Sequence, residues 1–200
     1  MIDSVWNLRR GEEIRLTRGV GTVLFTAEEI RARIAELGRE VARDYQGEVP
    51  VLVALLRGGF IFQCDLGRRV PIPQEFDFLQ VSRFNPTEKG RTAVKVMHDL
   101  RSDVRGRHVL VIEGLRTGSA KVEYVQRFLE LREPASLHFA ALVRQAGARE
   151  HPAVPLRYLG FDIGDEFVIG CGLDYEERYR NLPVIATFVP TASGGTAHAS

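Results

Sequence analysis

The chain has 200 residues and a formal net charge of +1, and 44% of its residues are hydrophobic and 26% charged. Such values are ordinary for a soluble globular protein, and the length suits one domain, which we place at residues 1–190. The near-neutral charge gives no reason to expect nucleic acid or a membrane surface as a partner.

The sequence also bears on membrane segments, targeting signals and the state of the cysteines. No apolar run approaches the roughly 18 residues of a membrane helix, and the N-terminus lacks the hydrophobic core of a signal peptide. Two cysteines, Cys64 and Cys171, lie in apolar surroundings without CxxC pairing. That pattern favours two buried free thiols over a disulfide or a metal pair. We therefore expect a cytoplasmic protein without a membrane partner.

The first clear element is a helix that begins after Thr26, whereas residues 1–22 are polar and irregular. Thr26 and Glu29 fit a capping box, in which each side chain satisfies a free backbone N–H of the first turn. Apolar residues then recur on one face until Gly47 ends the pattern, namely Ile30, Ile34, Leu37 and Val41.

Alternating strands and helices follow. "VPVLVALL" (49–56) is almost continuously apolar, which is typical of a strand covered on both faces, and "FIFQCDLGRRV" (60–70) predicts a second helix. "QEFDFLQVSRF" (74–84) alternates as a half-buried strand does, and residues 85–91 read as a loop. "AVKVMHDL" (93–100) predicts a strand that forms an antiparallel flap with the segment before that loop.

The stretch "HVLVIEGLRTGSAKVEYV" (108–125) predicts a strand ending at Glu113, a polar turn and an amphipathic helix. Backbone N–H groups at such a helix start, together with Arg116, suit a phosphate. The alternative is a tight turn that needs Gly118 only for its backbone angles, because the pattern matches neither of the common Gly-rich nucleotide motifs.

The last third of the chain predicts four more strands, a charged loop at 173–183 and a disordered tail at 191–200. The strands are expected at 135–143, 156–163, 166–170 and 184–189. Strands alternating with helices indicate an α/β domain with a mainly parallel central sheet. Ligands of such sheets bind at the carboxyl ends of the strands.

Several blocks resemble the hypoxanthine-guanine phosphoribosyltransferases of purine salvage, above all "VLVALLRGGFIFQCDL", "VKVMHDLRSDVRGRHVLVIE" and "DEFVIGCGLDYEERYRNLP". The resemblance implies the type I phosphoribosyltransferase fold, a five-stranded parallel core with a small hood. It also implies transfer of a 6-oxopurine to phosphoribosyl pyrophosphate with Mg²⁺, and assembly as a homodimer or homotetramer.

The resemblance further implies roles for individual residues. Pyrophosphate would contact Arg57, Gly58 and Arg180, and Asp174 would lie near the metal. The 5′-phosphate would lie at Arg116, Thr117, Gly118 and Ser119, and Glu113 would bind the ribose hydroxyls. Phe167 would stack on the purine, Val168 would contact it through the backbone, and Gln145 would donate to its 6-oxo group.

Four sites depart from the family pattern, and one of them is the Arg83-Phe84 pair, which aligns with the family's Ser-Tyr pair and lacks both hydroxyls. The loop after Glu113 is one residue shorter, Gly114 replaces one of two acidic residues, and Arg116 stands where the family has the Asp that accepts the purine N7 proton. Arginine cannot accept a proton at ordinary pH. Gln145 replaces a lysine, so the hydrogen bond is kept without the charge. We therefore expect reduced or altered activity.

Two functions stay open. One is a purine phosphoribosyltransferase weakened by the degenerate loop, and the other is a non-catalytic purine nucleotide-binding or regulatory protein on the same fold. The three strand histidines, His98, His108 and His138, lack a second ligand at metal spacing and favour structural roles. The Arg/Glu alternation in "YEERYR" is typical of a solvated face, with Arg180 as the exception.

Overall fold

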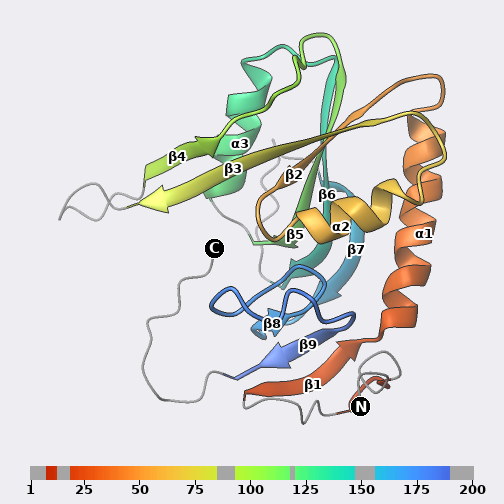
Figure 1. Cartoon of the computed structure of the whole chain (residues 1–200), viewed down its shortest axis with the longest axis vertical. Coiled ribbons are helices and arrows are strands. Elements are labelled where there is room, and N and C mark those ends of the chain that lie inside the picture. Colours follow the sequence, from red (N-terminus) through yellow and green to blue (C-terminus); the bar gives the residue numbers. More distant parts are fainter. Residues whose placement is uncertain (1–7, 13–18, 85–92, 118–119, 147–155, 190–200) are drawn as a thin grey trace.

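The structure is a computed structural model that describes residues 8–12, 19–84, 93–117, 120–146 and 156–189 (Figure 1). In chain order its elements are β1 (Val20–Phe25), α1 (Ala27–Asp44), β2 (Val51–Leu55), α2 (Phe60–Gly67), β3 (Glu75–Phe84), β4 (Ala93–His98), β5 (His108–Arg116), α3 (Ala120–Glu130), β6 (Ser136–Gln145), β7 (Leu156–Ile163), β8 (Val168–Ile169) and β9 (Ile185–Phe188). None of the helices described is long and apolar enough to cross a membrane.

A six-stranded sheet in the order β4-β3-β2-β5-β6-β7 forms the centre of the molecule (Figure 1). β3, β2, β5, β6 and β7 run parallel, and β4 pairs antiparallel with β3 at one edge. This arrangement confirms the expected α/β fold, with its five parallel strands and its antiparallel flap. All five residues of β2 are buried, as expected for a strand covered on both faces.

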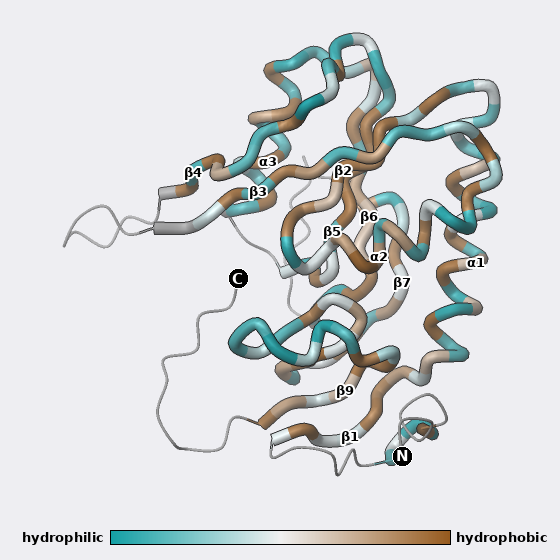
Figure 2. Tube along the Cα trace, in the orientation of Figure 1, coloured by the Kyte–Doolittle hydropathy of each residue, from teal (hydrophilic) through white to brown (hydrophobic). Residues whose placement is uncertain are grey.

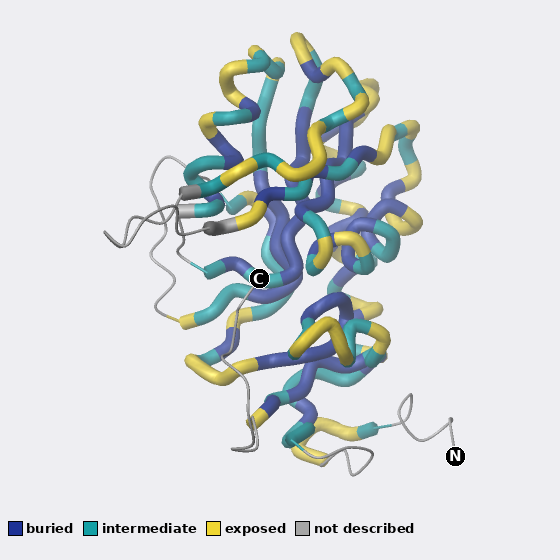
Figure 3. The backbone as a smooth tube through the Cα atoms, turned by 60° about the vertical axis from the view of Figure 1, so that its left-hand side comes forward, coloured by how far each residue is buried: buried dark blue, intermediate teal, exposed yellow. Residues whose placement is uncertain are grey.

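Helices cover both faces of the sheet (Figures 1 and 2). α1 and α2 pack on one face against Leu52 and Leu110, and α3 packs on the other against Val53 and Val111. The predicted capping box is confirmed, because Glu29 N donates to Thr26 Oγ1 (3.2 Å) and Thr26 N donates to Glu29 Oε2 (2.9 Å). The predicted apolar face of α1 is buried, and one of the two large hydrophobic clusters lies between this helix and the sheet (Figure 3).

The hood is a separate three-stranded sheet in the order β1-β9-β8 (Figure 1). The sequence predicts irregular structure for residues 1–22 and no strand before α1, so it misses β1 as a whole. Its register with β9 shifts twice, between Val20 and Val23 and between Val23 and Phe25, so "VGTVLF" carries no regular alternation. β8 is also shorter than the predicted strand at 166–170. The loop at 85–91 and the tail at 191–200 lie outside the described residues.

Candidate active site

Three chain segments meet closely at the carboxyl ends of β2 and β5. They are the β2–α2 turn at Gly58, which follows a cis Leu56–Arg57 peptide bond, β5 at Gly114, and the loop after β8 at Gly172. A Cβ atom added at Gly114 would lie 2.6 Å from the Gly58 carbonyl oxygen, and one added at Gly172 would lie 2.5 Å from the same atom. Only residues without a side chain allow this approach.

The structure brings together Arg57, Arg180 and Asp174, three of the residues that the sequence assigns to pyrophosphate and metal. Arg180 Nη1 donates to the Gly172 carbonyl oxygen (2.7 Å) and lies 2.8 Å from Asp174 Oδ1. Arg57 Nη1 and Arg180 Nη2 both donate to Glu177 Oε2, at 2.7 and 3.1 Å. Two guanidinium groups therefore converge on one oxyanion next to Gly58.

Glu177 is the member of this cluster that sequence reading missed, because the "YEERYR" segment was interpreted as a solvated face. Its side chain is 54% exposed, but it joins Arg57 to Arg180. Hydrogen bonding from Arg180, together with the charges of both arginines, lowers the pKa of Glu177 against the opposing effect of burial. The spacing of Glu177 and Arg180 by three residues is a local signal of the contact between these two side chains alone.

β5 does not end at Glu113 as predicted. It continues to Arg116, because Leu115 and Arg116 pair in parallel register with Val143 and Arg144 of β6. Gly114, Leu115 and Arg116 therefore belong to the sheet and not to the turn. Thr117 follows directly, while Gly118 and Ser119 lie outside the described residues, so the predicted phosphate loop stays a prediction.

Glu113 and Arg116 form a buried ion pair. Arg116 Nη1 lies 3.6 Å from Glu113 Oε1, and the two side chains are 9% and 5% exposed. The Arg116 guanidinium also lies over the Phe139 ring, 4.9 Å from its centroid, which places it against the core beneath α3. Burial raises the pKa of Glu113 to about 7, although the charges of Arg116 and Lys121 act in the opposite direction.

The predicted purine contacts lie on the hood and at the end of β6. Phe167 is 36% exposed and packs edge-on against Tyr175, with ring centroids 5.9 Å apart. Its carbonyl oxygen accepts from Phe188 N (2.8 Å), which ties it to β9, and Val168 is buried at the start of β8. Gln145 is the last residue of β6 and pairs with Ile163.

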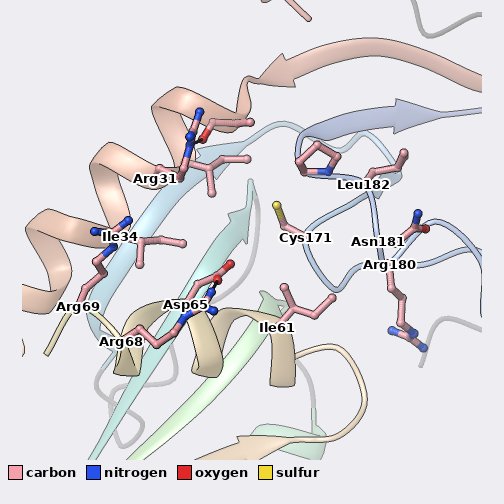
Figure 4. A pocket seen from close by; sticks show the side chains of 13 residues that line it. Arg31, Ile34, Ile61, Asp65, Arg68, Arg69, Cys171, Arg180, Asn181 and Leu182 are labelled. Atoms are coloured by element: carbon pink, nitrogen blue, oxygen red, sulfur yellow. Dashed lines mark hydrogen bonds and ion pairs between the residues drawn. The ribbon is translucent and has the colours of Figure 1, made fainter. Parts of the chain in front are cut away.

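A cavity of about 470 Å³ lies between α1, α2 and the loop after β8 (Figure 4). Of the predicted site residues that the structure describes, Arg180 alone lines it, and Figure 4 shows its guanidinium directed away from α1 and α2. The remaining lining is mixed, with apolar Ile30, Ile34, Ile61 and Leu182 beside Arg31, Arg68, Arg69 and Asp65. Arg180 thus belongs both to the lining of this cavity and to the cluster around Glu177.

The described residues hold no group of three or more His, Cys, Asp or Glu side chains arranged for a metal ion. A magnesium ion commonly needs no such group, since it binds one or two carboxylates together with phosphate oxygens of a substrate. Asp174, which is 12% exposed and lies 2.8 Å from Arg180 Nη1, fits that pattern.

Comparison with known proteins matches the phosphoribosyl transferase domain to residues 23–176. The chain is 39% identical over 177 residues to the hypoxanthine-guanine phosphoribosyltransferase of Mycobacterium bovis, covering 86% of this chain and 87% of that one. It is 42% identical over 169 residues to the hypoxanthine phosphoribosyltransferase of Salmonella typhimurium, covering 84% and 94%.

A solved structure agrees with these relatives. The hypoxanthine phosphoribosyltransferase of Staphylococcus aureus superposes with a TM-score of 0.80 at 34% identity, over 86% of this chain and 93% of that one. The chain therefore belongs to the hypoxanthine-guanine phosphoribosyltransferase family.

Proposed function

We propose that the protein transfers a 6-oxopurine to phosphoribosyl pyrophosphate, giving the nucleotide and pyrophosphate in purine salvage. The observation that carries this proposal is the convergence of Arg57 and Arg180 on a single carboxylate oxygen at the carboxyl end of β2. Paired guanidinium groups recognise phosphate oxygens with strong, charge-assisted hydrogen bonds. Relatives with 39–42% identity are named for this reaction.

In the proposed reaction a bond forms between a purine ring nitrogen and the anomeric carbon of ribose, while the bond from that carbon to pyrophosphate breaks. The leaving group takes the electron pair, and Arg57, Gly58 and Arg180 bind it as its negative charge develops. Asp174 would hold Mg²⁺, which offsets further charge on the pyrophosphate when it is bound. Glu113 would bind the ribose hydroxyls, and Thr117, Gly118 and Ser119 the 5′-phosphate.

The purine would lie against the exposed ring of Phe167, with its edge at the backbone of Val168 and at the amide of Gln145. Stacking on an aromatic ring holds a flat base and leaves the polar atoms at its edge available for hydrogen bonds. The 6-oxo group would then accept from the Gln145 amide, which is neutral and so binds less strongly than the lysine of the family pattern.

We further propose that the activity is reduced. Between Glu113 and Thr117 the chain has no second carboxylate, and Arg116 is paired with Glu113 and packed on Phe139. Loss of a general base costs roughly 10² to 10⁴ in rate, and water would have to accept the purine proton. The same feature favours the alternative, a protein that binds purine nucleotide without turning it over.

Pyrophosphate release with Mg²⁺, phosphoribosyl pyrophosphate and hypoxanthine, guanine or xanthine in turn tests the proposal. We expect measurable turnover with at least one base, and a loss of roughly tenfold or more in Asp174→Asn and in Glu113→Ala. Asp103→Asn, an exposed carboxylate at the opposite end of the sheet, is the matched control. Absence of turnover combined with thermal stabilisation by a nucleotide would establish the binding function instead.

A further inference from the structure

The contact between Glu177 and the two arginines uses a single carboxylate oxygen. Glu177 Oε2 accepts from Arg57 Nη1 (2.7 Å) and from Arg180 Nη2 (3.1 Å). One oxygen that receives donors from two guanidinium groups is in the position that a non-bridging phosphate oxygen takes between paired arginines. The carboxylate therefore fills the point at which an anionic ligand would be bound.

The two arginines are held differently. Arg180 is fixed without Glu177, because its side chain is only 15% exposed and its Nη1 contacts both the Gly172 carbonyl oxygen and Asp174. Arg57 is 59% exposed, and Glu177 is the residue that holds its guanidinium beside Arg180. Removal of the Glu177 charge would thus leave Arg180 in place and release Arg57 for another anion.

A tight turn places the Glu177 side chain. Tyr175 and Arg178 close the turn with two backbone hydrogen bonds of 3.2 and 3.0 Å, and Glu176 and Glu177 at its centre have φ values of +50° and +63°. Such backbone angles are unfavourable for residues other than glycine, asparagine and aspartate. The Glu177 N–H also donates to Asp174 Oδ2 (2.9 Å), so the turn is anchored to the same cluster.

We propose that Glu177 sets the affinity of this site for pyrophosphate by occupying it in the free protein and being displaced when pyrophosphate or the diphosphate of phosphoribosyl pyrophosphate binds. The inference rests on the proposed function, since it takes the arginine pair as the pyrophosphate site. A carboxylate and a pyrophosphate oxygen cannot both receive the same N–H groups, and their charges repel. Glu177 therefore weakens binding and speeds release of the product.

Glu177→Gln is the informative variant, because it keeps the shape of the side chain and removes its charge. An exposed ion pair is worth at most about 1 kcal/mol, a factor of about five, so we expect pyrophosphate to bind about two- to fivefold more tightly, with correspondingly slower release. Glu176→Gln is the matched control, since Glu176 is the exposed neighbour in the same turn, and we expect its affinity to equal that of the unchanged protein.

The experiment is calorimetric titration of the full chain with pyrophosphate in the presence of Mg²⁺, for the unchanged protein, both glutamine variants and Arg57→Ala. Weaker binding by Arg57→Ala identifies the titrated site, and tighter binding by Glu177→Gln alone supports the inference. Equal or weaker binding by Glu177→Gln overturns it and leaves the proposed function intact. No binding by the unchanged protein, or no effect of Arg57→Ala, overturns both.

Discussion

At the scale of single residues, the environment of Glu113 has the greatest chemical consequence. A carboxylate that is 5% exposed loses most of its hydration, and the nearest guanidinium nitrogen of Arg116 is 3.6 Å away, beyond a good hydrogen bond. The pKa of Glu113 is consequently raised from 4.5 to about 7 in spite of the nearby charges. Arg116 thus acts as the counter-charge of a buried acid in this arrangement.

This environment predicts a pH dependence of stability. Between about pH 4.5 and 7 the folded state binds more protons at Glu113 than the unfolded state does, so the free energy of unfolding falls as pH rises through that window. Glu113→Gln should remove this dependence, which amounts to a few kcal/mol. Urea unfolding of both proteins at about pH 5 and about pH 8 measures the difference.

Glu28→Gln, an exposed glutamate on α1, is the control for the Glu113 measurement and should follow the unchanged protein at both pH values. Other titrating groups contribute equally to the free energy of unfolding of both proteins, so they cancel in the difference between the unchanged protein and Glu113→Gln. One such group is His138, because burial lowers its pKa. If that difference is the same at both pH values, Glu113 does not have a raised pKa.

At the scale of secondary-structure elements, Gly114 has a packing role that the sequence pattern did not reveal. The residue stands where the family has an acid, but a Cβ there would lie 2.6 Å from the Gly58 carbonyl oxygen and 2.9 Å from Leu173 Cδ2. β5 and the β2–α2 turn can approach this closely only with glycine at the contact. A carboxylate cannot be restored at position 114 without moving the turn that carries Arg57.

Gly114→Ala should therefore destabilise the protein by about 1–3 kcal/mol, the usual cost of forcing an extra methyl group into a packed interior. Because the β2–α2 turn must shift, binding of pyrophosphate should weaken in the same variant. Gly164→Ala is the control, since the three atoms nearest its added Cβ all belong to the flexible carboxylate of Glu166. Urea unfolding and pyrophosphate titration that show no change in Gly114→Ala would contradict the packing role.

At the scale of the whole molecule, the hood joins the two ends of the described chain. β1 comes just before α1 and pairs with β9, the last strand, while β9 also pairs with β8 (Figure 1). Val23 is 1% exposed in a small core with Val184 and Ala186. Because β8 follows Phe167 directly, the small core of the hood supports the ring proposed to stack on the purine.

Truncation of Val23 to Ala should lower the melting temperature by roughly 2–6 °C, as expected for a cost of about 1–2 kcal/mol in a chain of this size. Binding of inosine monophosphate should weaken, because Phe167 loses support from the strands behind it. Val49→Ala, at an exposed valine, is the matched control and should leave both quantities unchanged. Calorimetric melting tests the first effect and nucleotide titration the second. Unchanged nucleotide affinity would show that the packing of the hood does not support the purine site.

The sequence alone determined which segments form helices and buried strands, and the family to which the chain belongs. Apolar spacing in α1 and the continuous apolar run of β2 depend on local periodicity and burial, so they can be read without knowledge of neighbours. The resemblance implied one pyrophosphate and metal site for Arg57, Arg180 and Asp174, and in the structure Arg180 contacts Asp174 and the carboxylate that Arg57 also contacts.

The tertiary structure decided what depends on partners distant in the chain. The extension of β5 to Arg116 needs β6, and the strand character of β1 needs β9. Glu177 meets Arg57 across 120 residues of sequence, so its exposed, charged surroundings give no local sign of the contact. Periodicity records how a residue relates to its own element, whereas register, charge pairing and close backbone approach are properties of two segments together.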